Sequence, residues 1–118
     1  MDLISRKLDV VFFSTTNGRE PVKEWLKKMS TFDRVTMSED IKTVQFGWPL
    51  GMPLVRKLAD GLWEIRVKLQ GGNIARVIFM MDRQCMILLH GFIKKSNKTP
   101  KNDLDLSKRR KRQYNLSK

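Results

Sequence analysis

The chain has 118 residues, of which 24 are Lys or Arg and 12 are Asp or Glu, so its formal net charge is +12. This length predicts a single domain spanning residues 1–118, and the charge indicates an anionic partner such as nucleic acid. One Cys and one His cannot build a zinc site, no apolar stretch is long enough to cross a bilayer, and no nucleotide-binding glycine loop is present. We therefore expect a cytoplasmic protein with no metal, no cofactor and no membrane segment.

The positive charge is concentrated at one end of the sequence. Residues 94–118 contain ten Lys or Arg and two Asp, which supply +8 of the +12. A solvated basic helix is the ordinary alternative. The uneven distribution favours polyanion binding over that alternative.

Before residue 54 the sequence predicts one strand and two helices. β-Branched and aromatic side chains at residues 8–14 are typical of a strand. Pro21 suits the first position of a helix. Apolar residues then recur at helical spacing, namely Val22, Trp25, Leu26 and Met29. A second helix is predicted over residues 32–46 by the inward positions Met37, Ile41 and Val44, and a turn-rich link follows it.

From Val55 onward the sequence becomes strand-like. Three strands are predicted at residues 62–69, 74–81 and 85–92, and the short turns between them indicate an antiparallel meander. Thr99 is predicted to cap a last helix, with Pro100 as its first residue.

The order of these elements predicts an α+β fold. We expect an antiparallel or mixed sheet of about four strands, two N-terminal helices packed on one face, and a basic C-terminal helix. The second face of the sheet is expected to be open.

The register of the first hairpin follows from the cost of burying charge. Pairing Leu69 with Asn73 across a three-residue turn makes one face purely apolar. Its cross-strand pairs are Trp63 with Phe79, Ile65 with Val77, and Val67 with Ala75. A one-residue slip would place Arg76 opposite Val67 in the core layer, which costs too much.

The favoured register places Arg66 directly opposite Arg76 on the second face. Like charges opposite each other are unfavourable, whereas a bound phosphate would explain the pair. Extending the pairing through residues 82–84 sets Met81 opposite Cys85 and His90 opposite Arg76, with Phe92 and Lys94 on the same side as His90. The alternative is that Arg76 reaches solvent and His90 is an ordinary sheet histidine.

Such a surface has the groups needed to cleave RNA by attack of a 2′-hydroxyl on the adjacent phosphate. Arg66, Arg76 and Lys94 would stabilise charge on the phosphoryl oxygens. His90 is the general acid or base, because its pKa ordinarily lies near neutrality. Phe92 would stack a base. An RNA-binding sheet without activity would use the same residue types.

Three segments resemble the RelE/HigB toxins, and in particular their phage-derived HigB-like branch. These are residues 57–66 (Lys-Leu-Ala-Asp-Gly-Leu-Trp-Glu-Ile-Arg), residues 75–79 and residues 89–100. The resemblance implies a RelE-like microbial-RNase fold. It also implies a toxin of a type II toxin–antitoxin pair that inhibits translation by cleaving mRNA in the ribosomal A site without a metal. The implied partners are a helix-turn-helix antitoxin, the ribosome and mRNA.

By position, the resemblance matches Arg66 to a phosphate-binding arginine and Arg76 to the arginine in the strand after the turn. It also matches Lys57 to a lysine that contacts the RNA backbone, and Lys94 and Lys95 to the basic pair that leaves the last strand. RelE carries a tyrosine shortly after its basic pair, but the only tyrosine here is Tyr114, which we expect to be a helix-packing residue. His90 or a lysine is therefore expected to do the acid–base work. The expected nucleic-acid contacts are Lys57, Lys68, Phe92, Lys95 and Lys98. A non-catalytic RNA- or DNA-binding module, or a protein that mainly binds its antitoxin at a promoter, is the alternative.

Overall fold

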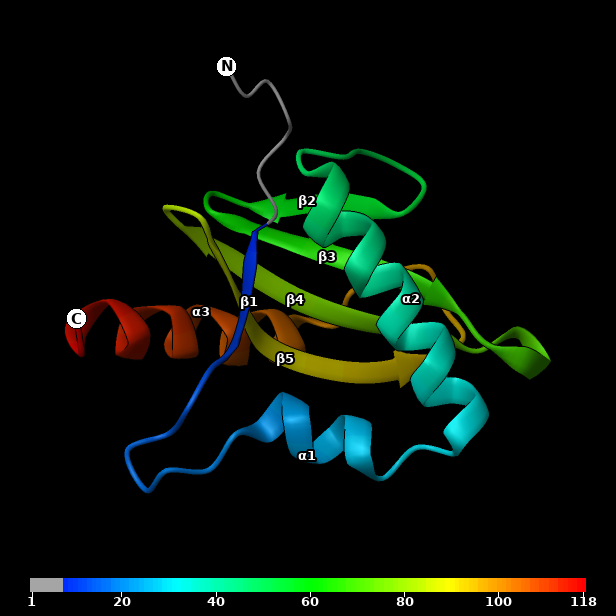
Figure 1. Cartoon of the computed structure of the whole chain (residues 1–118), viewed down its shortest axis with the longest axis horizontal. Coiled ribbons are helices and arrows are strands. Elements are labelled where there is room, and N and C mark those ends of the chain that lie inside the picture. Colours follow the sequence, from blue (N-terminus) through cyan, green and yellow to red (C-terminus); the bar gives the residue numbers. More distant parts are fainter. Residues whose placement is uncertain (1–7) are drawn as a thin grey trace, which may run out of the picture.

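A five-stranded mixed sheet forms the centre of the protein, with helices on both of its faces (Figure 1). The structure is a computed structural model that describes residues 8–118. The elements in chain order are β1 (Asp9–Phe12), α1 (Pro21–Lys27), α2 (Thr31–Gly47), β2 (Val55–Ala59), β3 (Leu62–Lys68), a short 3₁₀ turn (Gln70–Gly72), β4 (Ile74–Asp82), β5 (Cys85–Lys94) and α3 (Lys101–Leu116). No helix among the described residues is both long and apolar enough to cross a membrane.

The predicted α+β fold is confirmed, and the sheet has one strand more than expected. The strand order is β1-β5-β4-β3-β2, with β1 parallel to β5 and the other neighbours antiparallel. β2 is the additional strand. It lies at the sheet edge and joins β3 through Asp60 and Gly61, where Gly61 adopts a left-handed φ of +72°. An edge strand with two exposed basic residues has little apolar periodicity, so the sequence pattern did not separate it from the hairpin.

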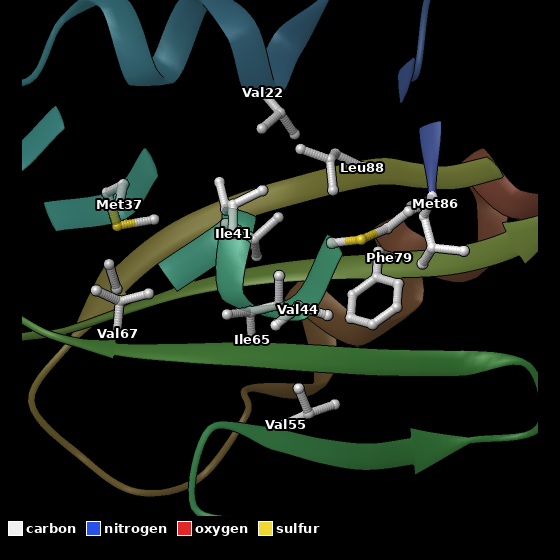
Figure 2. Close-up of a cluster of buried hydrophobic side chains, with 13 residues drawn as sticks. Val22, Met37, Ile41, Val44, Val55, Ile65, Val67, Phe79, Met86 and Leu88 are labelled. Carbon is white, nitrogen blue, oxygen red and sulfur yellow. The ribbon is translucent and has the colours of Figure 1, made fainter. Parts of the chain in front are cut away.

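The main core lies between the sheet and the two N-terminal helices (Figure 2). Val22 of α1 and Met37, Ile41 and Val44 of α2 are buried against it, as the helical spacing predicts. The predicted register of β3 and β4 is also confirmed: Trp63 pairs with Phe79, Ile65 with Val77, and Val67 with Ala75. The backbone N–H of Leu69 donates to the carbonyl of Asn73 at 2.9 Å, closing the three-residue turn. Burial of this apolar face therefore fixes the register.

The second face is not open, because α3 packs across part of it (Figure 1). Beneath α3, the strand residues that point to this second face are also apolar. They form a second buried cluster of Phe13, Leu62, Ile78, Met80, Ile87, Leu89 and Phe92. Leu104 and Tyr114 of α3 cover the cluster. Exposing such a surface to water would be unfavourable, so the helix is needed. The Tyr114 hydroxyl donates to Asp82 Oδ2 at 2.7 Å, which confirms the expected packing role.

The expected register of the second hairpin is wrong. Asp82, not Met81, pairs with Cys85 across a two-residue turn, in which Arg83 has a φ of +58°. The register then shifts between Ile78 and Phe79, leaving Leu89 without a partner in the ladder. This irregularity has the form of a β-bulge, which adds one residue to one strand and re-aims the side chains beyond it. As a result Phe92 lies opposite Arg76, and His90 lies opposite Ile78.

The start of α3 also differs from the expectation. Pro100 occupies the N-cap position and Lys101 is the first helical residue. The Thr99 hydroxyl does not cap the helix, because it donates to Glu64 Oε2 at 2.7 Å. The threonine therefore ties the segment before α3 to the sheet.

Substitution of Gly91 by Ala is expected to destabilise the fold. A Cβ at Gly91 of β5 would overlap the indole ring of Trp25 on α1, so the helix would have to move away from the sheet. We expect the free energy of unfolding to fall by about 1–3 kcal/mol in urea denaturation. Gly51→Ala is the matched control, because a Cβ there meets nothing within 4 Å. Equal stabilities of the two variants would contradict this packing.

Candidate nucleic-acid interface

Three arginines gather on the α3 side of the sheet. Arg66 of β3 is the direct partner of Arg76 in β4, as the sequence predicts. Arg56 of β2 is the direct partner of Glu64. Residues opposite each other in a ladder share a face, so all three guanidinium groups belong to one surface.

Arg56 was missed by the sequence reasoning, which selected the neighbouring Lys57. Lys57 pairs with Trp63, whose side chain packs in the core beneath α2. It therefore lies on the sheet face opposite to Arg56 and Arg66, and its contact with RNA stays a prediction. Both Arg56 and Lys57 are exposed in β2, so the sequence pattern does not tell which of the two shares the face of Arg66.

Arg76 is fully buried, although it carries a charge. Its Nη2 donates to the carbonyl oxygen of Ser96, and its Nε and Nη1 have no hydrogen-bond partner among residues 8–118. The guanidinium carbon lies 5.5 Å from the centroid of the Phe92 ring, at cation–π distance. Burial lowers the pKa of Arg76, and the charge of Arg66 lowers it further. A buried guanidinium with free donors is unfavourable by itself and is suited to receive an anion.

Glu64 is the carboxylate of this surface, and it is fully buried. Its Oε1 accepts a hydrogen bond from Arg66 Nη1 at 2.9 Å, and its Oε2 accepts the bond from Thr99. Arg66 also reaches Asn97, with Nη1 3.4 Å from the backbone oxygen and Nη2 3.4 Å from Oδ1. Arg56 Nη1 donates to the same backbone oxygen at 3.1 Å. The arginines are thus directed at the segment between β5 and α3.

His90 lies beside this group and is held by α3. Its Nε2 is 2.7 Å from Asp103 Oδ1, and its ring stacks on Phe92 with centroids 5.5 Å apart. The side chain is only 14% exposed, and this burial lowers its pKa, while Asp103 opposes the shift and Arg110 adds to it. A carboxylate can only accept, so Nε2–H is the donor in the neutral ring. Asp103 was not singled out from the sequence, because α3 was not expected to cover this face.

The other predicted RNA contacts divide into two groups. Phe92 is 9% exposed and lies between His90 and Arg76, so the expectation of a ring available for base stacking is wrong for this conformation. The four predicted lysine contacts on β3, at the end of β5 and after it are exposed, and these are Lys68, Lys94, Lys95 and Lys98. Lys68 and Lys94 both pair with Ile74, from the strands on either side of it. They therefore stand at one end of the basic surface.

The family of the chain follows from the same region. A family model described as "Phage derived protein Gp49-like (DUF891)" matches residues 24–112, which include every strand from β2 to β5 and all three arginines. The chain belongs to the Gp49-like family. This is a RelE-like, toxin-like family of toxin–antitoxin systems, as the resemblance implied at this broader level. A comparison with curated proteins gave no match.

The pKa of His90 can be measured directly, since the chain has one histidine. We expect proton NMR titration to give a value below the ordinary 6.5, and Asp103→Asn to lower it further by removing the charge that opposes the shift. Between the two pKa values the unfolded chain binds more protons, so the stability contributed by His90 falls as the pH drops below about 6.5. Asp105→Asn, on the exposed side of α3, is the control. A pKa at or above 6.5, or no response to Asp103→Asn, would contradict the observed burial.

Methionine substitutions of the paired arginines are expected to have opposite effects on stability. Arg76→Met removes a buried charge with two unpartnered nitrogens, so the free energy of unfolding should be unchanged or rise by about 1 kcal/mol. Arg66→Met leaves the buried Glu64 without its counter-charge and should cost about 3 kcal/mol. Thermal and urea denaturation of the two variants provide the measurement. A larger loss for Arg76→Met than for Arg66→Met would show that Arg76 is held for stability.

Proposed function

We propose that this Gp49-like protein is the toxin of a type II toxin–antitoxin pair, in the HigB-like branch, and acts as a ribosome-dependent mRNA endoribonuclease. The observation that carries the proposal is the pairing of Arg66 with Arg76, in which Arg76 is buried and two of its donor nitrogens have no hydrogen-bond partner within residues 8–118. Stability does not account for two opposed guanidinium groups. A phosphodiester placed against them would supply an anion that both guanidinium groups can bind.

The proposed reaction needs no metal. The 2′-hydroxyl of the mRNA attacks the adjacent phosphorus and its proton passes to a base; the bond from phosphorus to the 5′-oxygen of the next nucleotide breaks, and that oxygen takes a proton from solvent water. Arg66, Arg76 and Lys94 stabilise the charge on the phosphoryl oxygens, and removal of one such group typically costs about 10²–10³ in rate. The products are a 2′,3′-cyclic phosphate and a 5′-hydroxyl.

His90 is the proposed base. The lowered pKa keeps its ring neutral at pH 7, and Asp103 binds Nε2–H, which leaves the lone pair on Nδ1 to accept the proton. Asp103 thus acts on the reaction through the orientation and tautomer of His90.

The proposed partners follow from the charge of the chain. The mRNA and the ribosome are polyanions, and Lys68, Lys95 and Lys98 are exposed. Lys68 shares the sheet face of the arginines, and Lys95 and Lys98 lie in the segment to which the arginines donate. A helix-turn-helix antitoxin would cover this surface in the inactive complex. Action on translating ribosomes places the protein in the cytoplasm.

A non-catalytic nucleic-acid-binding module is the second candidate. The observation in its favour is that His90 and Phe92 are both largely buried, with the imidazole nitrogen Nε2 engaged by Asp103. A protein that only binds RNA or its antitoxin would retain the arginines and lysines and would leave His90 as a structural residue.

Alanine substitution of either paired arginine should abolish toxicity. Induced expression of the parent is expected to arrest growth and shorten mRNAs, and purified protein should cut mRNA at the A site of programmed ribosomes. Arg66→Ala and Arg76→Ala should each lower the cleavage rate about 10²–10³-fold. Arg34→Ala is the matched control, because Arg34 is exposed on α2 at the opposite face of the sheet.

Each candidate function has its own outcome in this assay. An Arg76→Ala protein as active as the parent would remove the arginine pair from the reaction. An undiminished rate for His90→Ala would remove His90 from the acid–base role. RNA binding by the parent without any A-site cleavage would favour the non-catalytic module.

A further inference from the structure

We propose that residues 95–99, which we call the lid, close the anion site of Arg56, Arg66 and Arg76 in the free protein, and that an RNA phosphate displaces them. Arg56 is thus a third arginine of the site, and the lid has a regulatory role. It rests on the proposed function only in taking RNA phosphate as the ligand.

The lid occupies the acceptor positions that a phosphate would take. All three arginines donate to it: Arg76 to the carbonyl of Ser96, Arg56 to the carbonyl of Asn97, and Arg66 to the carbonyl and the side-chain oxygen of Asn97. Two consecutive backbone carbonyls and one amide oxygen therefore face three cations. A phosphodiester has the same geometry of oxygen acceptors in a small volume, and it adds a negative charge.

The closed arrangement is electrostatically poor. The acceptors are neutral, and Glu64 is the carboxylate bonded to an arginine here. The lid itself carries two cations, Lys95 and Lys98, and no acidic residue. Arg76 remains with two unpartnered nitrogens beneath the lid. A phosphate accepts from guanidinium groups in bidentate geometry and brings the opposite charge, which the lid acceptors lack, so it would compete effectively for the arginines.

The lid is anchored in a way that permits it to move as a unit. Its residues from Lys95 to Lys98 are exposed, and its first end continues β5. At the other end the Thr99 hydroxyl donates to the buried Glu64, just before α3 begins. This bond holds the lid closed, while β5 and α3 remain fixed on either side of it by the two hydrophobic clusters.

If the lid competes with the phosphate, removal of a lid contact should raise the affinity for the phosphate. If the anion-binding form is only partly populated, the apparent affinity is reduced by that fraction. Loosening the lid should therefore strengthen binding, whereas loosening a segment that merely supports the site should weaken it. Thr99→Val removes the anchor bond, and Asn97→Ala removes one acceptor from Arg66 at an exposed position.

The test measures lid opening and anion binding separately in the full chain. Opening is read as the rate of tryptic cleavage after Lys95 and Lys98 by mass spectrometry. Binding is read by fluorescence anisotropy with a 2′-O-methylated oligoribonucleotide, which lacks the attacking hydroxyl and cannot be cut, and by competition with inorganic phosphate. Thr99→Val and Asn97→Ala should be cleaved faster in the lid and bind the probe about threefold to tenfold more tightly.

Three further variants test the role of Arg56 and the role of the Thr99 hydroxyl. Arg56→Gln should also open the lid but weaken probe binding, because Arg56 holds both. Thr99→Ser keeps the hydroxyl and should behave as the parent. Thr43→Val is the matched control, since Thr43 is an exposed threonine on α2 whose hydroxyl donates to the Glu39 carbonyl at 3.0 Å.

Faster lid cleavage in Thr99→Val or Asn97→Ala with unchanged or weaker binding would overturn the lid. Unchanged binding in Arg56→Gln would remove Arg56 from the site. A-site cleavage by the parent is measured in parallel. If the parent does not cleave mRNA but the variants still differ in probe binding as expected, the nuclease function is contradicted and the lid is supported. Normal cleavage, with equal binding by the parent and Thr99→Val, removes the lid and leaves the nuclease function.

Discussion

The pairing between β3 and β4 is the constraint on which the rest of the site depends. One side of these strands must be apolar to cover the helices α1 and α2, and only one register achieves this without burying a charge among them. The same register then places Arg66 and Arg76 opposite each other on the reverse side. The core on one face of the sheet thus determines the chemistry on the other, because side chains alternate between the faces at every residue.

The outcome for each element shows what local patterns can and cannot predict. The helices α1 and α2 and the β3–β4 register followed from apolar spacing and from the cost of a buried charge. The position of His90 did not, because it depends on the bulge at Leu89, which the short-range pattern of the strand does not report. The sequence did not indicate Asp103 or Arg56 for a related reason, because each joins the site only through a tertiary contact. Asp103 comes from a helix that was expected elsewhere, and Arg56 comes from an edge strand.

Arg66 and Arg76 differ in how their buried charges are compensated. Arg66 has a full counter-charge in Glu64, and the two form a conventional buried ion pair. Arg76 has only a backbone carbonyl and an aromatic face. A chain selected for stability alone would place an apolar residue at such a position, so the arginine is best explained by what it binds. Membership of a toxin-like family is consistent with this explanation.

The parallel pairing of β1 with β5 has a consequence for how the protein is made. Among the strands of residues 8–118, β1 comes first in the chain, yet the strand it pairs with, β5, comes last, with Asp9 beside Cys85 and Phe12 beside Leu88. Contacts so distant in sequence form late in folding, after the loop between them has closed. The sheet is therefore completed only after β5 has been translated, and α3, which supplies Asp103, follows β5 in the chain. The arginines of β2, β3 and β4 are thus synthesised well before the residue that holds His90, and the site is assembled only after all five strands and α3 have left the ribosome.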